Sequence, residues 1–170
     1  MIGELDEVGT GRWRLTFSRK LAHPADQVWQ AITKPEHLAA WFPQRIEGDL
    51  LTPGAPLRFV HSVDAPSFEG RVLTVEPPAV LEFLWGPDTI RLEITPAGDG
   101  CTLTLTDTIG ELGKAARDGA GWHTCLDFLE ASLDGGQPSF ESRERWQAVH
   151  AEYVAKFGPA AATIGPPEGF

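Results

Sequence analysis

The sequence has few cysteines and no long apolar segment, which excludes several classes of protein. It contains two cysteines, Cys101 and Cys125, among 170 residues, too few for the disulfide framework of a small secreted domain. No apolar run approaches the ~18 residues that a membrane span needs, and the acidic N-terminus lacks the apolar stretch of a signal peptide. These absences predict a soluble cytoplasmic protein.

Positive charge is also scarce. The chain has 14 Lys and Arg residues against 24 Asp and Glu residues, which gives a formal net charge of −10. Nucleic-acid-binding proteins need clustered basic residues to neutralise phosphates, and an anionic membrane surface attracts the same residues. The composition therefore excludes both as expected partners.

What is present is ordinary for a globular protein. Hydrophobic residues make up 42% and charged residues 22% of the chain, and a domain of this length can bury ~70% of its unfolded surface. No repeat or linker interrupts the sequence. We expect a single domain over residues 1–170, with a core at about 12–134 and loose tails at 1–11 and 159–170.

Alternating hydrophobicity predicts the strands. Trp13, Leu15 and Phe17 alternate with polar residues and indicate a half-buried strand. Two short helices follow, at 24–33 and 35–41, where Pro24 and Pro35 occupy favourable starting positions. Further strands are expected at about 44–47, 57–62, 68–75, 81–85, 90–94 and 101–106, joined by loops short enough to favour antiparallel neighbours.

Helical periodicity dominates the last third of the chain. Trp122, Cys125, Leu126, Leu129 and Leu133 recur on one face of a helix expected at about 114–134. Gly135-Gly136 ends it, and another helix is expected at 138–157. The sequence therefore predicts an α+β, helix-grip fold: a curved antiparallel sheet of about six or seven strands around a long C-terminal helix, with one extra C-terminal helix.

A family resemblance rests on short segments in a characteristic order. They are Ala22–Thr33, Pro35-Glu36-His37-Leu38 with Trp41, Phe68–Val72, Leu81–Trp85, Thr102–Leu105 and Gly121-Trp122. In this order and spacing the chain resembles the START-like (SRPBCC, Bet v 1-like) superfamily. Within it, the chain is similar to the branch named after the activator of the heat-shock-protein-90 ATPase.

The resemblance implies a container for a lipophilic or aromatic small molecule. It implies no catalytic motif, since the family carries no universal one. No cofactor or metal is expected, since the sequence contains no HExxH motif and no other pair of histidines spaced to bind a metal on a helix. The resemblance allows a chaperone-like protein partner, although the N-terminal domain of the named co-chaperone has no counterpart here.

A curved sheet and a straight helix leave a space between them that predicts an internal ligand cavity. Its expected lining comes from the inward positions of the strands and of the long helix: Phe59, His61, Phe83, Trp85, Leu92, Leu103, Leu105, Trp122, Cys125, Leu126 and Leu129.

Polar candidates are few. Glu69 and Arg71 share a strand face and would orient a ligand if that face is the inner one. His61 either hydrogen-bonds a ligand or lies at the end of the sheet in contact with water. His123 lies off the apolar face of its helix. Both cysteines fit packing better than catalysis.

Glycine patterns are uninformative about cofactors. No dinucleotide-binding or Walker A motif is present. Gly110, Gly113, Gly119 and Gly121 precede or begin the long helix, where they either fray it or form a flexible lid.

Three functions remain open at this stage. The first is non-catalytic binding of a hydrophobic or aromatic small molecule. The second is an enzyme, such as a cyclase, dehydratase or hydrolase of an aromatic or polyketide-like metabolite, using His61, Glu69 or a cavity acid. The third is a co-chaperone-like or regulatory protein-interaction module.

Overall fold

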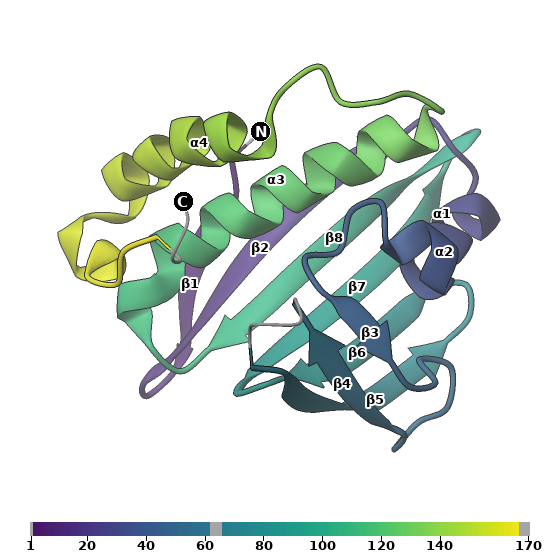
Figure 1. The fold of residues 1–170 in the computed structure, drawn as a ribbon, viewed down its shortest axis with the longest axis horizontal. Coiled ribbons are helices and arrows are strands. Elements are labelled where there is room, and N and C mark those ends of the chain that lie inside the picture. Colours follow the sequence, from purple (N-terminus) through teal and green to yellow (C-terminus); the bar gives the residue numbers. More distant parts are fainter. Residues whose placement is uncertain (1, 62–65, 167–170) are drawn as a thin grey trace. The chain divides into compact units, whose positions relative to one another are not determined.

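The computed structural model describes residues 2–61 and 66–166. Within these residues the largest element is an eight-stranded antiparallel sheet with the order β1-β2-β8-β7-β6-β5-β4-β3, accompanied by helices and short 3-10 turns (Figure 1). The strands are β1 (Glu4–Gly9), β2 (Arg12–Leu21), β3 (Arg45–Glu47), β4 (Pro56–Val60), β5 (Phe68–Glu76), β6 (Val80–Trp85), β7 (Asp88–Ala97) and β8 (Gly100–Ile109).

Within the described residues, four α-helices accompany the sheet. The two short helices predicted after the first long strand are α1 (Ala25–Thr33) and α2 (Pro35–Leu38), and the long helix is α3 (Ala115–Leu133). The last helix, α4 (Ser142–Phe157), begins four residues later than the expected Pro138. Short 3-10 turns, η1 (Leu112–Lys114) and η2 (Pro159–Ala162), precede α3 and follow α4.

The predicted α+β, helix-grip-like fold is confirmed, with one strand more than the upper expectation. The additional strand is β1, in a segment expected to be a tail. It shows no hydrophobic period because every residue except Leu5 is exposed. Its order comes from the backbone ladder with β2, in which Asp6 lies opposite Arg14.

Turn residues explain the hairpins at the centre of the sheet. Gly86 and Gly98 adopt φ values of +59° and +61° in the β6–β7 and β7–β8 connections. A left-handed backbone at these points favours glycine.

Contacts divide the chain into two compact units. Unit 1 comprises residues 1–17 and 108–170, and unit 2 comprises residues 18–107. The expected single domain stays a prediction, and each unit is described by itself below.

Unit 1 contains α4 packed alongside α3 (Figure 1). Trp146, Val149 and Tyr153 form the buried side of α4. Gly119 makes room for Tyr153, because a Cβ at this glycine would stand 3.2 Å from the tyrosine ring. A Cβ at Gly113 would collide with the Thr163 side chain at 2.1 Å. Two of the four glycines considered for a lid or a frayed end therefore serve packing.

The described part of the expected C-terminal tail is also ordered by contacts. Ala161 in η2 is buried, and the backbone N–H of Ile164 donates to the carbonyl oxygen of Gly113 at 3.0 Å. The segment after α4 therefore anchors to the start of α3.

Within the described residues, no helix is both long enough and apolar enough to cross a membrane.

Candidate functional site

The buried face of unit 2 carries a continuous group of aromatic rings, which we call the aromatic cluster. Its members are Phe42, Phe59, Phe68, Phe83 and Trp85. Phe59 stacks on Phe68 and Phe83 with ring centroids 5.1 and 5.9 Å apart, and Phe42 lies 6.1 Å from Phe59. Phe68 meets Trp85 edge to face at 5.6 Å. Such offset and edge-to-face contacts are the favourable geometries for aromatic side chains.

Strand register brings these rings together. Phe59 on β4 is the cross-strand partner of Phe68 on β5, and Trp85 on β6 lies opposite Gly70 on β5. Gly70 is required at this point: a Cβ would stand 1.9 Å from the Leu84 carbonyl oxygen and 2.6 Å from the Phe59 ring. The atoms that approach this glycine closely are therefore the protein's own backbone and an aromatic ring.

Two indole N–H groups near the cluster find partners. The Trp41 indole donates to the Ala31 carbonyl oxygen at 2.9 Å, and the Trp85 indole donates to Gln44 Oε1 at 3.0 Å. Both bonds satisfy a polar group in a mostly apolar environment, which is what a buried tryptophan requires.

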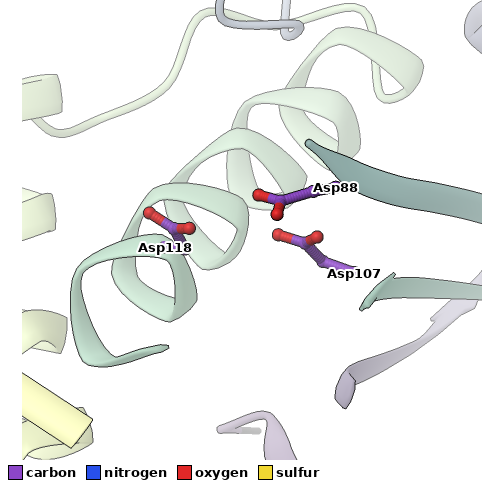
Figure 2. A group of neighbouring side chains, drawn as sticks. All are labelled: Asp88, Asp107 and Asp118. Atoms are coloured by element: carbon purple, nitrogen blue, oxygen red, sulfur yellow. The ribbon is translucent and has the colours of Figure 1, made fainter. Parts of the chain in front are cut away.

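The same sheet face carries two buried carboxylates that the sequence interpretation missed. Asp88 continues the inward series of Ile90, Leu92 and Ile94 on β7, and Asp107 continues that of β8. Both are almost fully buried, and their oxygens lie within 4.8 Å of each other (Figure 2). Extending the period-two pattern by one position on each strand would have found them.

Asp88 also adjoins the aromatic cluster. It is the cross-strand partner of Trp85, and directly opposite residues have Cβ atoms ~5 Å apart. Two acidic groups of unit 2 thus stand at the Trp85 end of the aromatic cluster.

Asp118 is the third side chain drawn in Figure 2 and belongs to unit 1. It lies in the first turn of α3, where a negative charge is favoured by the helix dipole. Within unit 1 it forms ion pairs with Arg117 at 2.9 Å and Lys114 at 3.9 Å.

The structure gathers most of the lining residues predicted on the strands. Phe59, Phe83, Leu92, Leu103 and Leu105 are buried at alternating positions of β4, β6, β7 and β8, and Trp85 is half-buried.

The polar candidates lie elsewhere. His61 is exposed beyond the end of β4. Glu69 and Arg71 are exposed and alternate with Phe68, Gly70 and Val72, which places them on the opposite face of β5. Arg71 donates to the carbonyl oxygen of Gly54. The question of face that the sequence left open is thereby answered: both side chains point outward.

The helix candidates belong to unit 1. Trp122, Leu126 and Leu129 are buried on α3, and Cys125 is half-buried. Their contribution to a ligand site stays a prediction.

Neither cysteine has the electrostatics of a nucleophile. Burial raises the pKa of the Cys101 thiol, and burial together with the Asp127 carboxylate raises the pKa of Cys125 to about 12. The thiolate is the nucleophilic form, so both thiols are protonated near neutral pH. Neither forms a disulfide within the described residues.

His123 sits in a polar network that joins α3 to α4. Its Nδ1 lies 2.9 Å from the Tyr153 hydroxyl, and its Nε2 lies 3.2 Å from Arg145 Nη2. Because a guanidinium only donates, Nε2 accepts and Nδ1 carries the proton, an assignment made from the bonding pattern. Arg145 also donates to Asp127 Oδ2 at 2.7 Å. This buried histidine is engaged in joining two helices.

The fold and the buried sheet face define a helix-grip protein of the START-like superfamily. More narrowly, residues 22–134 match the family "Activator of Hsp90 ATPase homolog 1-like protein". The chain belongs to this family, and the resemblance read from the sequence is confirmed. No curated protein matches the chain.

Solved structures share the fold. CalU16 from Micromonospora echinospora is 23% identical, with a TM-score of 0.70 over 92% of this chain and 99% of its own. A conserved protein from Enterococcus faecalis, EF2215, is 15% identical, with a TM-score of 0.73 over 92% of each chain. At these identities the likeness shows the fold alone.

DynU16, described as a protein in the dynemicin biosynthetic locus, is 30% identical with a TM-score of 0.64. The match covers 76% of this chain and 50% of DynU16, so the chain spans half the length of that protein.

Proposed function

We propose that this protein binds a hydrophobic or aromatic small molecule at the buried sheet face of unit 2. The observation that carries the proposal is the aromatic cluster, whose rings contact one another from Phe42 to Trp85. Ligand sites are predominantly lined by hydrophobic and aromatic side chains with a small number of polar groups. Asp88 and Asp107 supply polar groups on the same face.

The proposed lining keeps the sheet residues predicted from the sequence: Phe59, Phe83, Trp85, Leu92, Leu103 and Leu105. The predicted α3 residues Trp122, Cys125, Leu126 and Leu129 belong to unit 1 and stay predictions from the sequence. His61, Glu69 and Arg71 are left out of the lining because they are exposed.

A panel of naphthalene- and anthracene-based compounds tests this proposal. A ligand that binds the native state alone raises the unfolding temperature, and we expect at least one compound to do so. Phe83→Leu, which removes one ring of the cluster and stays apolar, should weaken the binding about tenfold or more by calorimetry.

Leu73→Ala is the matched control, because Leu73 is 40% exposed on the same sheet. It should leave the affinity unchanged. If no compound of the panel shifts the unfolding temperature, or if both variants weaken binding equally, the proposal is wrong.

The adjacent carboxylates favour a second candidate, acid–base catalysis on the bound molecule. Two carboxyl groups this close resist double ionisation. The protonated group can then donate its proton to the bound molecule, while the ionised group accepts a different proton from it. The position of DynU16 in a biosynthetic locus is consistent with such chemistry. Asp88→Asn and Asp107→Asn should each abolish conversion of a bound compound, followed by mass spectrometry, while its binding persists. Conversion by the double variant would exclude this candidate.

The family description alone favours a third candidate, contact with a chaperone. Stimulation of the Hsp90 ATPase by the purified protein tests it, and an unchanged ATPase rate at saturating concentration would dismiss it.

A further inference from the structure

Gln44 is a polar side chain bound at the Trp85 end of the aromatic cluster. It follows α2 and precedes β3, is half-buried, and its Oε1 accepts the Trp85 indole N–H at 3.0 Å. The two residues are 41 positions apart in the sequence. This bond therefore fixes a side chain of a connecting loop against the end of β6.

The bond also fixes which way the amide points. An indole N–H can only donate, so the atom that faces it must be the amide oxygen. The Gln44 NH2 group consequently points away from the indole with two donors. Among the described residues no hydrogen bond engages this NH2 group.

The surroundings of Trp85 show what such a donor would meet. Trp85 is half-buried, whereas Phe59 and Phe83 are fully buried, so the cluster becomes accessible at this end. The ring of Phe68 meets Trp85 edge to face at 5.6 Å and 74°. A planar molecule that packs against this pair lies beside the Gln44 amide.

We propose that Gln44 determines ligand specificity: its NH2 group donates to a carbonyl oxygen of an aromatic ligand packed against Trp85 and Phe68. The inference rests on the proposed ligand-binding function and narrows the ligand class to aromatic ketones, esters or quinones. A site that hydrogen-bonds a substrate oxygen discriminates against an analogue without it.

The other polar groups near Gln44 are less suited to bind a carbonyl oxygen. Asp88, across from Trp85, offers acceptor oxygens when ionised, so it suits a ligand's donor groups. On β3, Arg45 and Glu47 bind each other in an exposed ion pair at 2.9 Å. Gln44 is the group among these four that offers a neutral donor next to the aromatic cluster.

The experiment compares two probes that differ in one carbonyl group, 1-tetralone and tetralin. Their dissociation constants are measured by NMR titration of the full chain. We expect the wild-type protein to bind 1-tetralone about five- to tenfold more tightly than tetralin, the range of one neutral hydrogen bond.

Gln44→Glu keeps an oxygen acceptor for the Trp85 indole and removes the NH2 donors. It should bring 1-tetralone affinity down to that of tetralin and leave tetralin affinity unchanged. Gln44→Met, which is neutral and lacks donors, gives the same expectation if the carboxylate variant unfolds. Gln147→Glu, the same substitution at an exposed position of α4, is the matched control and should preserve the preference.

Three results would overturn the inference. If both probes bind with equal affinity, or if the preference survives in both Gln44 variants, Gln44 does not hydrogen-bond the ligand's carbonyl oxygen. The proposed binding of aromatic ligands would be unaffected by either result. If neither probe binds and the aromatic panel also fails, the proposed function falls and takes this inference with it.

Discussion

At Tyr153 a single hydroxyl oxygen connects three segments of unit 1. It accepts the backbone N–H of Gly3 at 2.8 Å and the Nδ1–H of His123 from α3, while its own ring belongs to α4. Tyr153 is fully buried. A buried donor that loses its acceptor costs more than the hydrogen bond contributes, because water cannot replace the acceptor.

Tyr153→Phe should therefore lower the free energy of unfolding by about 2–4 kcal/mol, with two buried donors left without this acceptor. Urea unfolding followed by tryptophan fluorescence measures the change. Gln147→Ala on the exposed side of the same helix should stay within about 0.5 kcal/mol of wild type. A loss no larger than that of the control would show that the hydroxyl contributes nothing to stability.

The raised pKa of Cys125 predicts that the free energy of unfolding depends on pH above about pH 9. Its pKa is raised from 9.0 to about 12 in the folded protein, first by burial and then by Asp127. The unfolded chain releases this proton near pH 9 and the folded chain only near pH 12, so the stabilising contribution is complete below pH 9. It is lost as pH rises toward 12, at up to about 1.4 kcal/mol per pH unit.

The measurement is the difference in unfolding free energy between wild type and Cys125→Ala from pH 8 to pH 11. The difference should be constant up to about pH 9 and should then shift against the wild type. A difference that is independent of pH would contradict the raised pKa. Comparing the two proteins removes the titration of other groups.

The alternating pattern correctly predicted the inward-facing positions of the strands wherever those positions carry apolar side chains. The inward positions Phe59, Phe83 and Leu92 were found because apolar side chains mark them. Asp88 and Asp107 were missed because charged residues normally interrupt such a series and face water. The contacts of His123 depend on α4, whose packing partner no local pattern specifies.

At the scale of elements, the β5–β6 pair determines the geometry of the aromatic cluster. Gly70→Ala should cost about 3 kcal/mol or more and lower the unfolding temperature, since the new methyl group meets the Leu84 backbone and the Phe59 ring. Gly9→Ala is the control, because its nearest neighbour would be 3.9 Å away. Equal stability of the two variants, measured by differential scanning calorimetry, would refute the close approach.

Helices and inner strands were predictable and the edge strand β1 was not. Inner strands bury one face and therefore alternate, as on β7 and β8. The β1 strand is exposed on nearly every residue, so its sequence carries no period. Its pairing with β2 is a long-range backbone property that composition does not report.

For the whole molecule, the segment beyond the family match is part of the fold. The match ends at residue 134, whereas α4 buries Trp146, Val149 and Tyr153. Burying such side chains contributes about 1.5–3 kcal/mol each. The segment matched by the family therefore lacks a helix that contributes to the stability of the protein.

A chain that ends at Gly136 should accordingly lose several kcal/mol of stability and expose α3 in unit 1. Circular dichroism melting and binding of a hydrophobic dye measure this. The 170-residue chain with Gln147→Ala, which leaves the buried side of α4 intact, should behave as wild type. An unchanged melting temperature of the shortened chain would show that α4 is dispensable.

The acidic edge strand has a consequence for crowded solutions. Glu4, Asp6 and Glu7 line β1. Lys156 forms an ion pair with Glu4, and Arg14 on β2 lies opposite Asp6, whereas the cross-strand partner of Glu7 is the uncharged Trp13. Two molecules approaching edge to edge would bring like charges together before their backbones could pair, a repulsion that discourages endless strand-to-strand stacking. The strand that lacked any recognisable pattern is thus one that helps keep copies from polymerising into fibres.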